Sequence, residues 1–137
     1  MQRTKGATGE RELAGLLRDR LGLDIRRNLE QARSGGADLL GLPGLSLECK
    51  RAAVPKLGPW WEQTIQQAGE RVPVLAFRVD RQPWRFLIPL GAILPGTEEQ
   101  PNSLEFTATL SIEGFSLWFR ERLASSAPSV IADSSLQ

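Results

Sequence analysis

One short stretch, residues 34–50, constrains the fold of this chain more than any other part of it. It contains two apolar runs, residues 37–42 and 45–51, which are separated only by Pro43-Gly44. Proline and glycine in succession favour a tight turn, and apolar runs of this length are typical of strands. The stretch therefore predicts a β-hairpin, and any charged residue inside it must lie on one of the two faces of a sheet.

Three charged residues interrupt this hairpin: Asp38 on the first strand, and Glu48 and Lys50 on the second. Residues two apart in a strand share a face, so Glu48 and Lys50 point the same way and Cys49 points to the other face, beside Leu45 and Leu47. Asp38 can lie across from the pair, because the turn is short. Two carboxylates and a backbone carbonyl would then converge on one spot.

Oxygen ligands of this kind suit Mg²⁺, which keeps several waters and accepts further ligands from a substrate phosphate. Lys50 would lie beside that phosphate, where it could orient or help deprotonate a water and neutralise developing charge. The alternative is a salt bridge on an exposed strand face. Gly35-Gly36, just before Asp38, leaves backbone room for a ligand and favours the first interpretation.

The composition narrows the chemistry that is available. The 137 residues include no histidine and a single cysteine, Cys49. Histidine-based triads, histidine-ligated zinc and an intrachain disulfide are therefore excluded, and acid, base or metal chemistry must come from Asp, Glu and Lys. The sequence has no apolar run near the roughly 18 residues that cross a membrane and no apolar segment behind its first residues, so a cytosolic protein without a membrane partner is expected.

Charge is distributed unevenly along the chain. Residues 1–56 carry 11 Lys/Arg and 7 Asp/Glu, whereas residues 57–137 carry 6 and 9, although the net charge of the whole chain is only +1. The basic half also contains the hairpin, which suits a polyanionic partner such as a nucleic acid. The alternative is an arginine-rich helix face exposed to solvent.

The remaining pattern predicts an α/β fold in one domain. Leucines recur at helical spacing over residues 8–21, where Gly22 is a candidate C-cap, and a second helix is expected over residues 60–71 after Pro59. Half-buried or apolar strands are expected over residues 23–29, 37–42, 45–51, 74–79, 84–88 and 104–110, with a loop over residues 91–103. This order suggests a mixed sheet with helices packed on it.

A last helix is expected after Ser111, which can act as its N-cap. Bulky apolar contacts of this helix are predicted from five residues: Phe115, Leu117, Trp118, Phe119 and Leu123. The domain is expected to span residues 1–123, and the Ser/Ala-rich residues 124–137 are expected to form a flexible tail.

Three segments together resemble a known family. Residues 5–13 (KGATGEREL) look like an opening K-G-x-x-x-E-R-E-L helix, residues 33–41 (RSGGADLLG) are similar to a shortened R-x-x-x-S-G-x-x-x-P-D-I segment, and residues 47–50 (LECK) look like an E-x-K strand. The chain resembles the PD-(D/E)XK nuclease superfamily, and is similar to the archaeal Holliday-junction resolvases and related phage and bacterial nucleases. The match covers about residues 3–90 and implies a restriction-endonuclease-like mixed sheet flanked by helices.

Position by position, the resemblance implies a catalytic site. Asp38 and Glu48 would bind the metal with the backbone carbonyl of Cys49, Lys50 would be the catalytic lysine, and Glu10 would reach the metal through water. The metal would be Mg²⁺, with Mn²⁺ as the alternative. The site glutamine would be Gln63, with Gln67 one turn later as its competitor. The alternative for Glu10 is an acid at a helix N-terminus, which the macrodipole favours.

Basic residues on either side of these positions are candidates for phosphate contacts, which hold a nucleic-acid backbone without reading its bases. The candidates for DNA binding are Arg3, Lys5, Arg11, Arg26, Arg27, Arg33, Ser34, Arg51 and Lys56. Each arginine could instead be a solvated side chain. Trp60 or Trp61 could stack on a base, although the spacing of Trp61 is that of a core residue.

The sequence thus predicts a magnesium-dependent DNA endonuclease, bacterial or phage-encoded. Because a small domain with one site must pair with a second copy to cut both strands, a homodimer is expected. The resemblance favours branched DNA such as a Holliday junction as the substrate. The alternatives are a nuclease for duplex or flap DNA, and a DNA-binding module that keeps the fold without catalysis.

Overall fold

The computed structural model of the protein describes residues 2–30 and 36–126, with side chains from Gly6 onward. In chain order the elements are α1 (Gln2–Leu21), β1 (Arg26–Arg27), β2 (Leu39–Leu40), β3 (Leu45–Ala52), α3 (Leu57–Ala68), β4 (Val72–Val79), β5 (Arg85–Pro89), α4 (Leu90–Ile93), the 3₁₀ turn η1 (Leu104–Phe106), β6 (Thr107–Leu110) and α5 (Ile112–Ser126). None of the described helices is both long enough and apolar enough to span a membrane.

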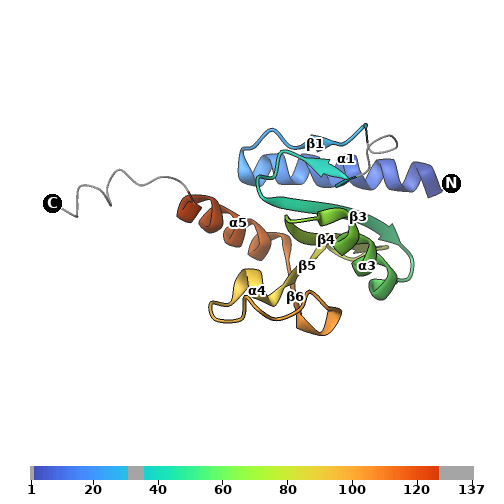
Figure 1. Ribbon diagram of the computed structural model, residues 1–137. Coiled ribbons are helices and arrows are strands. Elements are labelled where there is room, and N and C mark those ends of the chain that lie inside the picture. Colours follow the sequence, from blue (N-terminus) through green and yellow to red (C-terminus); the bar gives the residue numbers. More distant parts are fainter. Residues whose placement is uncertain (1, 31–35, 127–137) are drawn as a thin grey trace.

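A six-stranded mixed sheet lies at the centre, with the strands in the order of the sequence (Figure 1). Neighbouring strands are antiparallel except β3 and β4, which are parallel and are connected through α3. A parallel pair needs such a crossover, because its second strand must start again at the same end of the sheet. The sheet and its helices confirm the predicted α/β class.

Helices α1 and α5 cover one face of the sheet and enclose the larger core. Leu13 and Leu17 of α1 are fully buried there, as the leucine spacing predicts, together with Phe115 and Phe119 of α5. The ring of Phe115 stacks on that of Phe86 in β5, with centroids 4.4 Å apart. This contact fixes the last helix against β5, next to the edge strand β6.

Helix α3 covers the opposite face through a smaller core. Trp61 is 2% exposed and packs with Leu75, Phe77 and Leu87, so the prediction that it is a core residue is confirmed. Its indole N–H donates to the carbonyl of Asn102 at 2.8 Å, which satisfies the one polar atom that this burial removes from water.

Two predicted helix boundaries are confirmed by their hydrogen bonds. Gly22 adopts a φ of +69° after α1, and its N–H donates to the Arg18 carbonyl at 2.9 Å. The Ser111 hydroxyl accepts the N–H of Gly114 at 3.0 Å and so caps the start of α5.

Both strands that precede β3 are shorter than predicted. β2 ends at Leu40 because Gly41 has a φ of +97° and lies so close to the backbone of Asp24 that a side chain would clash. β1 contains only Arg26 and Arg27, because Ile25 turns back and donates its N–H to the Leu23 carbonyl.

The other corrections concern the second half of the chain. Helix α3 begins three residues early and ends before Gly69, whose positive φ does not continue a helix. The predicted loop over residues 91–103 contains most of α4, and the first part of the predicted strand over residues 104–110 is the 3₁₀ turn. In α5, Leu117 is 56% exposed, so its predicted core contact is wrong, and the helix continues to Ser126. Residues 127–137 of the predicted tail lie outside the described part of the chain.

Glu12 ties α1 to the sheet, and this generates a first prediction. Its Oε1 accepts the Arg78 guanidinium at 2.6 Å and the Trp84 indole N–H at 2.7 Å. Burial alone would raise the pKa of Glu12, but these two hydrogen bonds outweigh it and lower the pKa. The stabilisation is therefore present above the ordinary value of 4.5 and is lost as the pH falls below it.

We expect Glu12→Gln to lower the free energy of unfolding by about 1–2 kcal/mol at pH 7, and by less at pH 4. Denaturant unfolding at the two pH values measures the difference. The control is Glu113→Gln, since Glu113 pairs with Arg20 at 3.2 Å on an exposed surface and should cost under about 0.5 kcal/mol. An equal loss at both pH values would contradict the charge-based account.

Candidate active site

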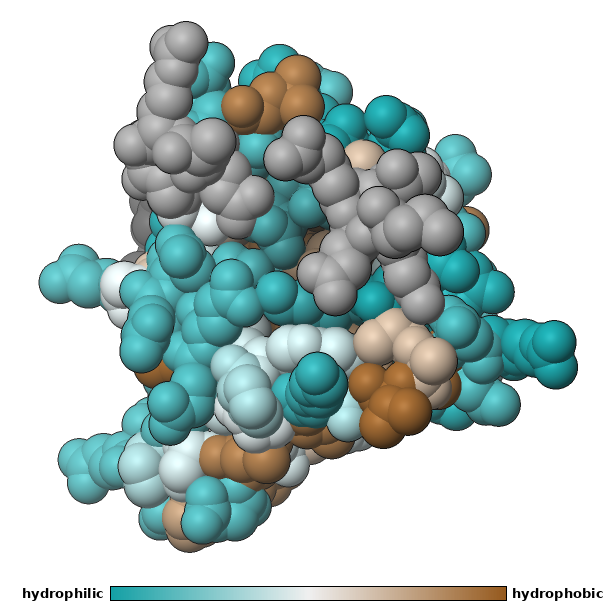
Figure 2. Space-filling model, turned by 90° about the vertical axis from the view of Figure 1, so that its right-hand side faces the viewer, coloured by the Kyte–Doolittle hydropathy of each residue, from teal (hydrophilic) through white to brown (hydrophobic). Residues whose placement is uncertain are grey.

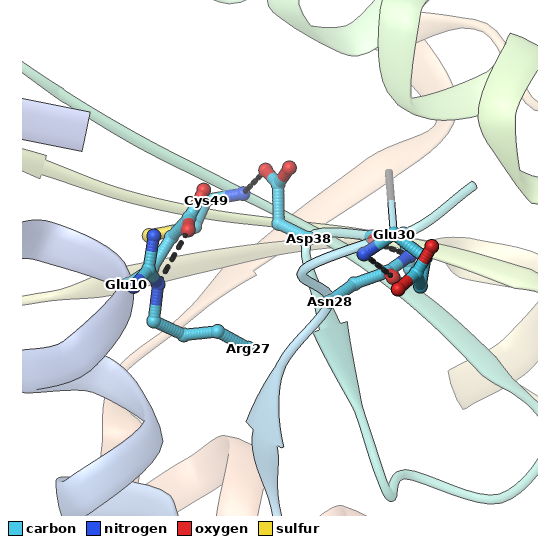
Figure 3. Close-up of polar contacts among 7 residues, drawn as sticks. Glu10, Arg27, Asn28, Glu30, Asp38 and Cys49 are labelled. Atoms are coloured by element: carbon cyan, nitrogen blue, oxygen red, sulfur yellow. Dashed lines mark hydrogen bonds and ion pairs between the residues drawn. The ribbon is translucent and has the colours of Figure 1, made fainter. Parts of the chain in front are cut away.

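Asp38 lies just before β2, beside the part of β3 that extends beyond the short β2 strand. The strands pair at Leu39 and Leu47, and the Asp38 N–H donates to the Leu47 carbonyl at 2.9 Å. β2 goes no further along β3, so the N–H of Cys49 meets no strand there. The Asp38 carboxylate accepts this N–H instead, at 2.7 Å (Figure 3).

Asn28 holds Asp38 from the other side. Its backbone N–H donates to the Asp38 carbonyl at 2.9 Å, and its side-chain amide donates to the carbonyl of Ala37, also at 2.9 Å. Sequence reasoning missed this residue. The available signal was an asparagine at the end of a strand, where its side chain commonly bonds nearby backbone.

Glu48 and Cys49 point to opposite faces of β3, as the strand period predicts. Cys49 lies in the larger core with Leu45 and Leu47, whereas Glu48 is in register with Leu75 on the α3 face. Burial, followed by the neighbouring carboxylates, raises the pKa of the Cys49 thiol well above its usual value. The thiol therefore stays protonated, which makes it a poor nucleophile.

The Glu48 side chain is the most unusual group in the structure. It is 1% exposed, and neither carboxylate oxygen accepts a hydrogen bond from a donor group in the described part of the chain, although the Asp38 carboxyl lies within hydrogen-bonding reach. Burial, and then the negative charge of Asp38, raises the pKa of Glu48 to about 9. The alternative of a salt bridge on an exposed strand face is wrong, because the carboxylate is buried and no ion pair between described residues joins it to Lys50.

One cavity of about 720 Å³ brings most of the predicted site residues together. It is lined by residues of α1, the segment before β2, β3 with the connection that follows it, and α3: Gly6, Glu10, Asp38, Glu48, Cys49, Lys50, Arg51, Ala52, Ala53, Lys56, Trp60, Gln63 and Gln67. These residues come from four separate parts of the chain, so only the tertiary fold creates the cavity. Figure 2 views the molecule from the side of the α1 N-terminus, where the surface is mainly hydrophilic.

The two glutamines of α3 differ in their contacts. Gln67 Oε1 accepts the N–H of Gly36 at 2.7 Å, two residues before Asp38, and so fixes that segment. Gln63, one turn earlier, lines the cavity, and its side-chain amide makes no hydrogen bond to any other described residue. The geometry gives Gln67 a positioning contact and leaves the Gln63 amide available to a ligand.

Glu10 lies in the third turn of α1, because the helix begins at Gln2. The alternative of an acid at the helix N-terminus is therefore wrong. Its Oε1 accepts the Nε–H of Arg27 at 3.0 Å, and both side chains are partly buried. Burial raises the pKa of Glu10, and Arg27 only partly opposes this rise.

The predicted DNA-binding residues have different surroundings. Arg51 and Lys56 line the cavity, Arg11 and Arg26 are exposed, and Arg27 is engaged by Glu10. The Arg51 stem packs against Gly9 of α1, where a Cβ would come within 2.9 Å of it. The side chains of Arg3, Lys5, Arg33 and Ser34 lie outside the described part of the structure.

The donor set fits a hard divalent cation. No group of three or more His, Cys, Asp or Glu side chains among the described residues forms a ready metal cage. Asp38 and Glu48 provide two carboxylates, and the unpartnered oxygens of Glu48 lack the compensation that a buried charge needs. Proteins generally bind Mg²⁺ through one or two carboxylates, with water and substrate phosphate as the other ligands.

The comparison with protein families now identifies the chain. The family model described as phage putative PDDEXK endonuclease matches residues 1–113. The chain belongs to this family. It is a nuclease of PD-(D/E)XK type, and the mixed sheet flanked by helices is the restriction-endonuclease-like fold that its sequence predicts.

A solved structure is also similar to this PDDEXK endonuclease. It is the Holliday junction resolvase of the archaeal hyperthermophile Archaeoglobus fulgidus, with 21% sequence identity and a TM-score of 0.47 over 82% of this chain and 88% of that one. No curated protein matches the chain.

The burial of Glu48 generates a second prediction. Because its folded pKa is about 9 and its ordinary value is 4.5, the penalty for burying the carboxylate is absent below pH 4.5 and grows as the pH rises towards 9. Without metal, Glu48→Gln should therefore be more stable than the native chain at pH 8, by about 1–3 kcal/mol, and nearly equal to it at pH 4.5.

Denaturant unfolding in EDTA at the two pH values measures this difference. Glu62→Gln is the matched control, because Glu62 is exposed on α3, and its effect should not change with pH. If Glu48→Gln proves less stable than the native chain at pH 8, the carboxylate must have a compensating partner without metal.

Proposed function

We propose that this protein is a magnesium-dependent DNA endonuclease that hydrolyses phosphodiester bonds and prefers branched DNA. The observation that carries the proposal is the Glu48 carboxylate, which is buried without a partner beside Asp38 in the cavity that also contains Lys50. A carboxylate in such a place is costly unless a cation compensates it. The family supports a nuclease, and nucleases of this type generally use divalent metals.

Asp38, Glu48 and the backbone carbonyl of Cys49 would hold the ion. In a strand the N–H and C=O of one residue point to the same side, so the Cys49 carbonyl faces the side from which its N–H bonds Asp38. When bound, Mg²⁺ would supply Lewis-acid polarisation of a phosphate oxygen and a more acidic water. Mn²⁺ would serve the same donors.

Lys50 is the proposed catalytic lysine. It follows Glu48 by two residues, on the same face of β3, and its half-buried side chain lines the cavity without an ion pair to any described residue. Its ammonium could hold a phosphate oxygen, orient the attacking water and offset the charge that develops on the phosphate. Gln63, also in the cavity wall, would contribute an amide to the same water.

Arg51 and Lys56 on the cavity wall, with Arg11 and Arg26 on the surface nearby, would contact phosphates on either side of the cut. Trp60 also lines the cavity, and its ring packs on Phe77 with centroids 6.3 Å apart, so it could stack on a splayed base. Such contacts follow the shape of the backbone and need no base sequence. Together with the three segments that resemble the resolvases, they favour branched DNA over ordinary duplex.

The principal test is cleavage of a four-way junction, a flap and a linear duplex in Mg²⁺. We expect junction cutting with symmetric nicks, dependence on the metal, and a loss of at least about 100-fold in Glu48→Gln or Lys50→Ala, because each removes a group in contact with the reacting phosphate or its ion. Cutting that survives Glu48→Gln would refute the site. Junction binding without metal-dependent cutting would favour a DNA-binding module, and equal cutting of duplex or flap would favour the broader nuclease.

The two glutamines allow a second test. Gln63→Ala should lower the cleavage rate about tenfold and leave thermal stability unchanged, because its amide bonds no described residue. Gln67→Ala should lower both, because it frees Gly36 and the segment that leads to Asp38. The opposite pattern would make Gln67 the site glutamine.

Light scattering of the purified chain tests the proposed homodimer, which two cuts on opposite strands require.

A further inference from the structure

Glu10 differs from Glu48 because the protein supplies its counter-charge. The Arg27 Nε–H lies 3.0 Å from Glu10 Oε1, and the two side chains are 27% and 18% exposed (Figure 3). The Glu48 oxygens, in contrast, accept no hydrogen bond from any described residue. A partly buried ion pair is screened by salt much less than an exposed one.

The pairing of β1 with β2 positions Arg27 to bind Glu10. Arg27 is in register with Leu39, the residue after Asp38, so the ladder that places Asp38 also places Arg27. Residues one apart in a strand face opposite ways, and Arg26 is accordingly exposed while Arg27 turns towards α1. Arg27 is therefore held against Glu10, which lines the cavity.

Glu10 lines the same cavity as Asp38 and Glu48, so a free Glu10 carboxylate would be available to a second divalent ion there. A guanidinium bonded to Glu10 removes one carboxylate from that set, since arginine stays charged and cannot be displaced by deprotonation. We propose that Arg27 is a positioning residue that holds Glu10 outside the coordination shell and limits each chain to one divalent ion. The inference rests on the metal site of the proposed function and deepens it.

The test counts Mn²⁺ on the full chain without DNA, by electron paramagnetic resonance and calorimetry. The native chain should bind one ion, and Arg27→Gln should bind a second ion or bind Mn²⁺ at least about tenfold more tightly, because a freed Glu10 becomes available as a ligand. Arg27→Lys, which keeps the charge, should remain at one ion. Arg26→Gln is the matched control and should leave the count and the affinity unchanged.

Variants at Glu10 separate this role from a merely structural one. Glu10→Gln should still bind one ion, and the double variant Glu10→Gln/Arg27→Gln should lose the second ion that Arg27→Gln gains. If Glu10→Gln loses the ion, Glu10 is itself a ligand and the proposal is overturned, even if Arg27→Gln fails to fold. An Arg27→Gln chain that folds and binds Mn²⁺ as the native chain does would also overturn it.

The outcome for Glu48→Gln distinguishes the two proposals. If the native chain binds one ion and Glu48→Gln binds none, the proposed metal site is supported, whatever the result for Arg27→Gln. Mn²⁺ binding that is unchanged in Glu48→Gln would refute the site itself, and with it the function proposed above.

Discussion

The site depends on one hydrogen bond, from the Cys49 N–H to the Asp38 carboxylate at 2.7 Å. It forms because β2 is only two residues long and leaves part of β3 without an antiparallel neighbour. The Asp38 carboxylate takes the place of a strand partner for the Cys49 N–H. Buried backbone N–H groups need a hydrogen-bond acceptor, and this need places an acid beside β3. The cavity lies beside this unpaired part of β3, next to Asp38 and Cys49.

The parallel pairing of β3 and β4 supplies the second constraint. With α3 on one face and α1 on the other, both faces of β3 are covered and the strand is buried along most of its length. Glu48 is therefore buried, and its neighbours Leu47 and Leu75 are apolar. The cost of that burial is the reason for the proposed cation, and the pairing of Arg27 with Glu10 is the reason for the proposed limit of one ion.

Much of this arrangement could be read from local sequence. Alternation along residues 45–51 placed Glu48 and Lys50 on one face and Cys49 on the other, and the Pro43-Gly44 turn, the Gly22 C-cap and the Ser111 N-cap followed from the chemistry of single residues. The errors arose where distant parts of the chain meet. The close approach of Gly41 to Asp24 shortened β2, and helix α5 left Leu117 exposed because its neighbours Phe115 and Phe119 face the sheet.

The sequence by itself determined the donor chemistry. Without histidine, and with its one cysteine on the core face of a strand, the chain offers a metal mainly carboxylate and amide oxygens, and offers a phosphate lysine and arginine. Tertiary structure alone decided which of these groups meet. The burial of Glu48, the contact of Gln67 with Gly36 and the pairing of Arg27 with Glu10 join residues 17 to 31 positions apart or depend on cover from both faces of the sheet. Local periodicity carries no information about such contacts, because they depend on how the packed elements meet.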